Sequence, residues 1–334
     1  MAVADAPGTT EAGDVEVERR SSTWMESLAL PAIWIVLIIV FAIAEPGSFL
    51  SSENAANVFG SNAALLMVAI AALLPFVVGD FDFSVGAVSG LSAMIIADLN
   101  VNHHVGIVLA CLIGVAIGLA TGGINAAAIL TFETDPFIIT LATGTIATGV
   151  VYAISDSDTV AGTSQGLTQI VFNDELLGIP LEFYFGLAIV AIAWYWMRLT
   201  PSGQRALFVG QSREVARLTG IRVKRVRAST FLASGLIAGL SGVIAVGAAG
   251  SADPSSGPAL LLPAFAAAFL GMTTIEPGRF NAIGTTIAVF FLATGVDGLQ
   301  LLGVQDWIQD IFYGGVLVIA VTASRLLQRQ RLTR

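Results

Sequence analysis

The feature that most constrains this chain is a series of long apolar runs separated by short polar breaks. A helix needs about 20 residues to cross the hydrocarbon core of a bilayer, and several runs reach that length. Charged residues are 12% of the chain, about half the usual share of a soluble domain. The sequence therefore predicts an all-α membrane protein with about ten transmembrane helices. The candidate spans are residues 28–44, 63–79, 83–99, 105–130, 137–154, 183–197, 230–249, 259–273, 280–296 and 311–323.

The lysines and arginines predict the orientation, because basic loops stay in the cytoplasm. None of the 15 basic residues lies within a candidate span, and none lies between Ser21 and Met197. Ten spans with the N-terminus inside place all the basic residues on the cytoplasmic side. An odd number of spans would leave one group of basic residues outside the cell. We therefore expect cytoplasmic N- and C-termini in a bacterial cell membrane. The loops 155–182 and 250–258 are then expected to face outward.

The chain divides into three predicted parts. Residues 1–27 are polar and acidic and predict a disordered cytoplasmic tail. Residues 28–324 predict the transmembrane domain, and residues 325–334 a basic cytoplasmic tail. Membrane lipid is the expected surrounding, and the net charge of −9 argues against nucleic acid as a partner.

Glycine within the spans predicts close helix packing. Gly114, Gly118 and Gly122 recur every four residues, as do Gly235 and Gly239. This spacing places small residues on one helix face, where another backbone can approach closely. The polar breaks 79–86 and 250–257 also hint at an internal duplication, which transporters often contain.

Chemistry-bearing residues gather first between the second and third spans. Asp80, Phe81, Asp82, Phe83 and Ser84 stand there between two apolar runs. Carboxylates at membrane depth are costly and must face protein or water. One interpretation is that this break lines a solute pathway, with a phenylalanine ring offering a flat face to a sugar. The other is an ordinary polar loop whose serine hydroxyl caps the third span.

The second segment is the basic stretch 198–227, the longest predicted cytoplasmic loop. Helix-forming residues run over 213–218, and Gly220 is well placed to end a short helix in a left-handed cap. We therefore expect a short helix on the cytoplasmic face, after which the chain turns back towards the membrane.

These motifs resemble the permease subunits of bacterial ABC importers of the ribose, xylose and galactose type, which are related to branched-chain amino acid permeases. The family signature, approximately GGIDLSVG, is similar to Gly79–Gly86, in which phenylalanines stand at two aliphatic positions. The coupling pattern E-A-A-x-x-x-G is similar to Glu214, Ala216 and Gly220. Further similarity lies in 218–226, 277–281 and 298–303, so that the resemblance covers about residues 28–327.

The resemblance implies a type II ABC importer-like permease bundle with a cytoplasmic coupling helix. Two permease subunits would form the pathway between them, ABC ATPase subunits would dock on the helix, and an extracytoplasmic solute-binding protein would deliver the solute. A monosaccharide is the expected solute. The residues expected to carry coupling are Arg213, Glu214, Ala216, Arg217, Leu218 and Gly220. The chain has no phosphate-binding loop, so ATP hydrolysis is expected on a separate subunit.

Two other functions would need residues that the sequence does not offer. An ion-coupled secondary transporter needs embedded carboxylates with basic partners; Asp80, Asp82 and Asp297 are candidates, but no basic residue is expected in a span to pair with them. An intramembrane enzyme needs a nucleophile and base or a metal cluster, and His103, His104 and Cys111 offer neither. We expect no catalytic residue, cofactor or metal. A branched-chain amino acid, a nucleoside or a polyol remains an alternative solute.

Overall fold

The computed structural model describes the backbone of residues 10–332 and the side chains of residues 27–322. Helix dominates it, as the apolar runs predict. The helices are α1 Thr10–Ala44, α2 Ser52–Gly60, α3 Ala63–Val77, α4 Val85–Val101, α5 Ile107–Phe132, α6 Pro136–Ser155, α7 Gln165–Thr168, η1 Gln169–Asn173, α8 Leu181–Leu199, α9 Pro201–Gln211, α10 Arg213–Leu218, α11 Val223–Ala249, α12 Ser256–Ala259, α13 Leu261–Gly271, α14 Ala282–Leu301 and α15 Trp307–Leu332.

Every predicted span overlaps one of these helices. Among the described residues, six segments are long and apolar enough to cross a membrane: Ser27–Ala44, Ser52–Val77, Ile107–Phe132, Pro136–Ser155, Val223–Ala249 and Ala282–Leu301. Helices α8 and α9 meet at an angle of 75° and would make a seventh span if taken together. The shorter apolar segments are α4, the part of α15 whose side chains are described, Trp307–Thr322, and the pair α12 and α13. The chain is thus a helical membrane protein with at least six candidate spans.

The structure describes helical backbone in most of both predicted tails. Helix α1 begins at Thr10, so the backbone is already helical across residues 10–27. The charged residues that precede the first apolar run include good helix formers, which favour continuing the helix through them. Helix α15 likewise continues to Leu332. Residues 1–9 and 333–334 lie outside the described residues, and the three-part division stays a prediction.

Helix α3 is the centre of the bundle and α1 its periphery. In the most apolar window of Ser52–Val77, 78% of residues are buried, against 11% in Ser27–Ala44. Helix α3 packs against α11, α13, α8 and α14. Because α3 is covered on all faces, its sequence is apolar all round, as expected for a helix in a bundle interior.

The glycine strips bring α5 and α11 into direct backbone contact, as predicted. A Cβ atom on Gly118 would lie 2.5 Å from the carbonyl oxygen of Gly235 and 2.8 Å from Cα of Gly239. One on Gly122 would lie 3.2 Å from Cα of Gly235. These separations leave no room for a side chain, so the glycines fix how closely the two helices approach.

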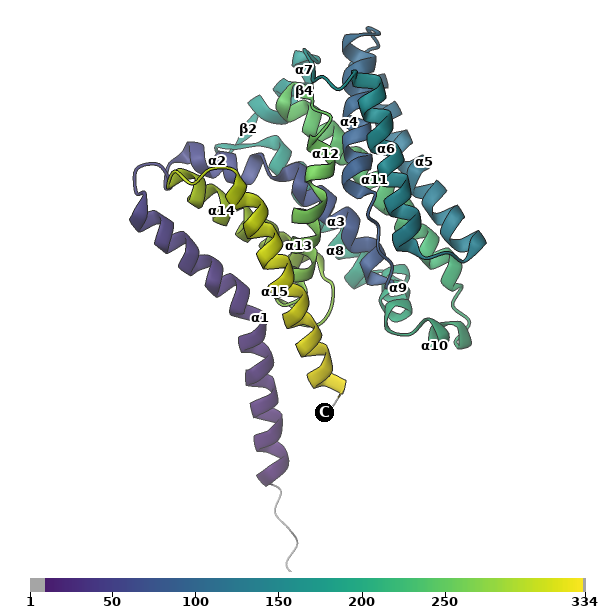
Figure 1. Ribbon diagram of the computed structural model, residues 1–334. Helices are drawn as coiled ribbons and strands as arrows, with labels where there is room; N and C mark the ends of the chain where they lie inside the picture. The colour runs from purple at the N-terminus through teal and green to yellow at the C-terminus, as the bar shows by residue number, and fades with distance from the viewer. Residues whose placement is uncertain (1–9, 333–334) are drawn as a thin grey trace, which may run out of the picture.

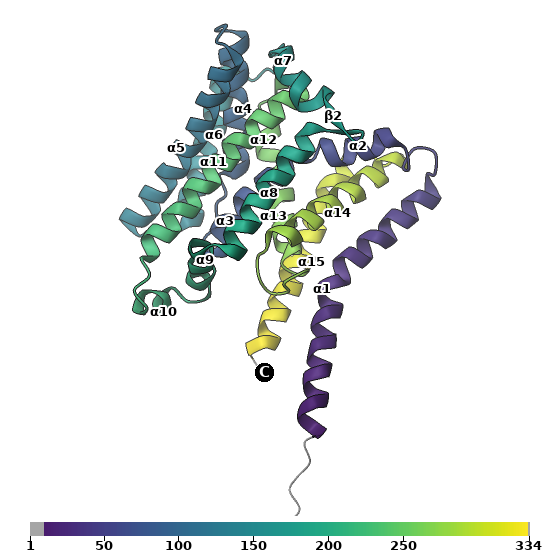
Figure 2. The same ribbon diagram turned by 180° about the vertical axis from the view of Figure 1, so that it is seen from behind.

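The bundle has two distinct ends (Figures 1 and 2). One, called here the α10 end, carries α9, α10 and the C-terminal end of α15. The other, the α7 end, carries α7, β4 and the C-terminal end of α4. Strands β1 Val160–Ala161 and β4 Ser251–Ala252 pair antiparallel, and β2 Glu175–Leu176 pairs with β3 Ile179–Pro180. The β1–β4 pair therefore joins the loops 155–182 and 250–258, which the sequence predicts to face the same side of the membrane.

The basic residues that the structure describes gather at the α10 end. The stretch 198–227 includes α9 and α10, and Arg279 lines a small cavity together with Arg198. Arg198 also forms an ion pair with Glu276, in the connection between α13 and α14. The charge asymmetry that the sequence predicts across the membrane is thus present as an asymmetry between the two ends of the bundle.

Candidate functional site

The break between α3 and α4 covers residues 78–84 and is folded into the bundle rather than left as a surface loop. Asp80, Asp82 and Ser84 are each 1% exposed. The chain reverses at Gly79, whose φ of 76° is in the left-handed region that glycine adopts readily. Buried polar groups need hydrogen-bond partners, and the structure supplies them from helices far away in the sequence.

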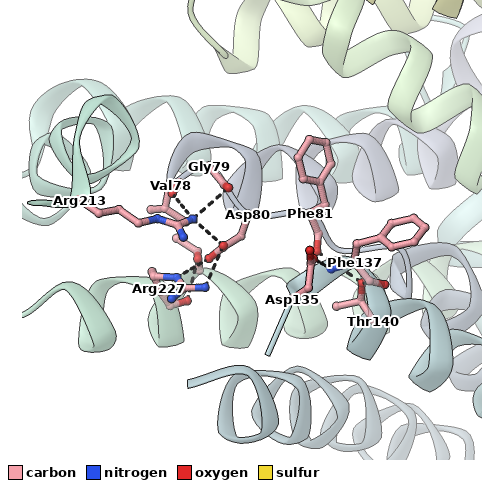
Figure 3. A network of polar contacts seen from close by, with 10 residues as sticks. Val78, Gly79, Asp80, Phe81, Asp135, Phe137, Thr140, Arg213 and Arg227 are labelled. Carbon is pink, nitrogen blue, oxygen red and sulfur yellow. Dashed lines mark hydrogen bonds and ion pairs between the residues drawn. The ribbon is translucent and has the colours of Figure 1, made fainter. Parts of the chain in front are cut away.

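Asp80 is held by two arginines (Figure 3). Arg227 on α11 donates from Nε to Oδ2 at 2.6 Å and from Nη2 to Oδ1 at 2.9 Å, a two-point contact. Arg213 on α10 donates from Nη2 to Oδ1 at 2.6 Å and also to the carbonyl oxygens of Val78 and Gly79. Charge-assisted hydrogen bonds of this kind are stronger than neutral ones.

The expectation that these carboxylates lack basic partners is therefore wrong for Asp80. Helix α11 begins at Val223, seven residues before the predicted span, so Arg227 lies within the helix that packs beside the break. Arg213 reaches the same carboxylate from the segment outside the spans. We name the set Asp80, Arg213 and Arg227 the arginine clamp.

Asp82 and Ser84 form a second, separate network. Asp82 accepts hydrogen bonds from the Ser84 backbone N–H at 3.0 Å, from Ser84 Oγ at 2.6 Å and from Ser234 Oγ at 2.9 Å. Asn125 Nδ2 donates to Ser84 Oγ at 2.9 Å. The predicted cap by the Ser84 hydroxyl is wrong, because that hydroxyl makes no capping bond to α4 and donates to Asp82 instead.

Phe81 and Phe83 belong to a cluster of aromatic rings at the break. The centroid of the Phe81 ring lies 5.2 Å from that of Phe76 and 6.2 Å from that of Phe83. The centroids of the Phe83 and Phe265 rings are 4.7 Å apart. Phe81 is 41% exposed, so one part of its ring is free of the described residues. Of the five residues predicted to line a pathway, Phe81 alone offers a large exposed surface.

Helix α10 has the bounds that the sequence predicts. Ser212 caps it by accepting the Val215 N–H at 3.3 Å, and Gly220 follows with a φ of 84°. Ala216 is buried on the face of α10 that packs against the bundle. The other residues of the predicted coupling motif, Glu214, Arg217, Leu218 and Gly220, are exposed. Glu214 lies in the first turn and Arg217 in the last, which suits the helix dipole.

A polar stripe on α11 connects these features, and the sequence reasoning missed it. Arg227 contacts Asp80, Ser234 contacts Asp82, and Ser241 accepts a hydrogen bond from Ser89 at 3.1 Å. Seven residues separate each member of the stripe from the next, which keeps them on one helix face. This regular spacing is the signal that could have predicted a polar face on α11, although not the partners that it contacts.

An apolar helical bundle that buries a polar break and ties it to a short exposed helix suits a membrane transport protein, and the family match shows that class. Residues 54–321 match the family described as the branched-chain amino acid transport system / permease component, and the chain belongs to that family. It is a permease component and not an enzyme, and the resemblance to permease subunits of bacterial ABC importers is confirmed.

Curated relatives align along most of their length. The D-allose transport system permease protein AlsC of Escherichia coli is 30% identical, over 89% of this chain and 91% of the relative. The ribose import permease protein RbsC of Bacillus subtilis is 34% identical, over 87% and 90%. The autoinducer 2 import system permease protein LsrD of Photorhabdus luminescens is 31% identical, over 89% and 90%. No solved structure matches the chain.

Proposed function

We propose that this chain forms the transmembrane pathway of an ABC importer for a neutral monosaccharide, with α10 as the helix that receives the motion of the ATPase. The arginine clamp is the observation that carries the proposal. Arg213 is the first residue of α10, and its guanidinium reaches the buried Asp80 in the break between α3 and α4. A displacement of α10 is thereby passed to the ends of two membrane helices.

The exposed face of α10 supports its assignment as a docking surface. Glu214, Arg217 and Leu218 point away from the bundle, and Leu218 is 82% exposed. Charged side chains around an apolar anchor are the composition expected of a protein–protein contact. We assign this surface to a pair of ABC ATPase subunits on the cytoplasmic side, and Gly220 to the turn that lets α10 and α11 meet.

The membrane arrangement in this proposal has ten spans. Helices α1, α3, α4, α5, α6, α8, α11, α14 and α15, and the pair α12 and α13, would each cross the bilayer or most of it, with both termini in the cytoplasm. The gathering of the described basic residues at the α10 end supports this orientation. The α7 end would then meet a solute-binding protein, and a second permease subunit would complete the pathway.

The proposed pathway passes the break between α3 and α4. Phe81 offers the exposed ring face there, while Phe83 supports it from within the aromatic cluster. Asp80, Asp82 and Ser84 hold the break in shape through their hydrogen bonds. A monosaccharide suits this lining, and the substrates in the names of the relatives, D-allose and ribose, favour sugars.

The coupling assignment is tested by Gly220→Ala in the complex reconstituted with its ATPase and binding protein. Gly220 has a φ of 84°, so alanine strains the turn after α10 by about 1–2 kcal/mol. We expect less solute imported per ATP hydrolysed, with normal insertion. Gly178→Ala is the matched control, because Gly178 has a φ of 76° and equal open space but lies at the α7 end. If the two variants import the same amount of solute per ATP hydrolysed, the assignment is contradicted.

A further inference from the structure

A cavity of about 360 Å³ lies on the far side of the bundle from α10. Its walls come from α3, α4, α11 and α12, together with the first turn of α8. Helix α12 lies beside α4 in both views (Figures 1 and 2). Along α11, Ala245 in the cavity wall is 18 residues from Arg227, or about 27 Å at 1.5 Å per residue. The cavity is therefore separate from the arginine clamp and falls in the size range of small-molecule sites.

Glu182 lies in the wall of this cavity and is 1% exposed. Its Oε1 atom is buried and has no hydrogen-bond partner among the described residues. The nearest basic residue along α8 is Arg198, sixteen positions away, about 24 Å along the helix. A buried carboxylate with neither a cation nor a donor is costly, so a donor from a bound molecule would stabilise it.

The serines of the cavity wall have already donated their hydroxyl hydrogens. Ser61 donates to Asn57 Oδ1 at 2.9 Å, and Ser256 donates to the Asp253 carbonyl at 2.8 Å. The Ser241 hydroxyl donates its hydrogen to the carbonyl oxygen of Ala64, so between Ser89 and Ser241 it is Ser89 that donates. These serines therefore offer lone pairs to the cavity and no hydrogen.

The polar side chains of the lining, which also include Asp253 and Ser251, thus offer mainly acceptors and favour a ligand that is rich in donors. A sugar carries several O–H donors and no charge, so it can donate to Glu182 and to the serine oxygens together. Phe172, also in the wall, adds an aromatic face. An amino acid fits less well: its ammonium group could donate to Glu182, but its carboxylate would find no donor among these acceptor side chains.

We infer that this cavity holds a neutral polyhydroxylated solute during import, and that Glu182 accepts hydrogen bonds from the solute's hydroxyl groups. The inference rests on the proposed function and adds a binding site that lies within one subunit. The contact between Ser89 in the cavity wall and Ser241 on α11 also places the site on the helix that carries Arg227. Movement of the arginine clamp would therefore reach the site through α11.

Two substitutions test the site in the complete complex, with radiolabelled D-ribose and D-allose as probes in proteoliposomes. Glu182→Gln keeps the shape and removes the charge, which weakens the hydrogen bonds accepted from the solute. We expect its KM for uptake to rise at least about ten-fold. Ala245→Phe keeps the carboxylate and fills the cavity, and we expect it to abolish uptake. Glu175→Gln, an exposed carboxylate of the same loop region, is the matched control and should transport as the unaltered protein does.

The outcomes separate this inference from the proposed function. Basal ATP hydrolysis by each variant complex reports assembly, and we expect it to be retained. If the unaltered complex imports neither sugar on addition of ATP, the proposed function fails. If the unaltered complex imports a sugar but Glu182→Gln stays within about two-fold of its KM, or Ala245→Phe imports normally, the cavity is not the solute site.

Discussion

Removing one arginine from the clamp gives a prediction whose size follows from the geometry. Arg227 has a side chain 14% exposed and makes two contacts to the fully buried carboxylate of Asp80. Breaking a buried ion pair by deleting one partner costs about 3–5 kcal/mol. Arg213 is 42% exposed, and solvent screening reduces the value of its contact to about 1 kcal/mol. Arg227→Gln should therefore loosen the break much more than Arg213→Gln.

Hydrogen exchange measured by mass spectrometry on the purified protein tests this difference. A loss of about 3 kcal/mol raises the local opening constant more than about 100-fold, since about 1.4 kcal/mol corresponds to ten-fold. We expect faster exchange of the amides in 78–84 and 219–227 for Arg227→Gln. Lys224→Gln is the matched control, because Lys224 pairs with Glu133 on the exposed surface of the same end. It should leave exchange in 78–84 unchanged.

A double substitution checks the reasoning from the opposite direction. Adding Asp80→Asn to Arg227→Gln removes the buried charge that has lost its two-point partner and keeps only the contact to Arg213, so part of the lost protection should return. The reasoning is refuted if Arg227→Gln and Arg213→Gln change exchange equally, or if the double variant exchanges faster than the sum of its parts predicts.

Three further predictions concern other contacts. Gly118→Val should destabilise the protein in detergent by about 1–3 kcal/mol, because a Cβ at residue 118 would lie 2.5 Å from the Gly235 carbonyl oxygen. The control Gly123→Ala should be tolerated, because its Cβ would meet its nearest neighbour at 3.5 Å. Equal melting temperatures of the two variants would contradict this. Ser234→Ala removes a donor to a buried carboxylate and should cost about 1–3 kcal/mol; unchanged thermal unfolding would argue against it. Hydrogen bonds from the side chain and backbone N–H of Ser255 and from Thr159 hold the pKa of Asp253 below its ordinary value. Their stabilisation is therefore present above about pH 4 and is lost as the pH falls through the lowered pKa. The protection factors of the amides in β1 and β4, corrected for the intrinsic pH dependence of exchange, should fall in acid, and pH-independent protection factors would refute the link.

Local sequence patterns predicted the helices well because they act over a few residues. Each apolar run became a helix, and the helix formers of 213–218 followed by Gly220 predicted both α10 and the left-handed turn after it. The four-residue glycine repeats predicted a close helix contact, since i and i+4 share a face. The structure adds which helices meet, since the strips of α5 and α11 lie against each other.

Contacts between distant segments could not be predicted in the same way. Asp80 lies 147 positions from Arg227, and nothing near either residue shows that they meet. Glu182 was assigned to an outward loop, yet β3 and α8 bury it against the bundle. Ser84 had the residue type of a helix cap, but the carboxylate of Asp82 competes for the same hydroxyl at 2.6 Å.

The most direct test of the account is the sidedness of α10. Leu218 is 82% exposed on α10 and Leu177 is 90% exposed between β2 and β3 near the α7 end. Each is changed to cysteine in a protein in which Cys111, the one cysteine of the sequence, is replaced by serine. With a membrane-impermeant thiol reagent, we predict that Leu218→Cys reacts in inside-out vesicles and is protected by the ATPase, and that Leu177→Cys reacts in intact cells. Labelling of Leu218→Cys from outside intact cells would contradict the account.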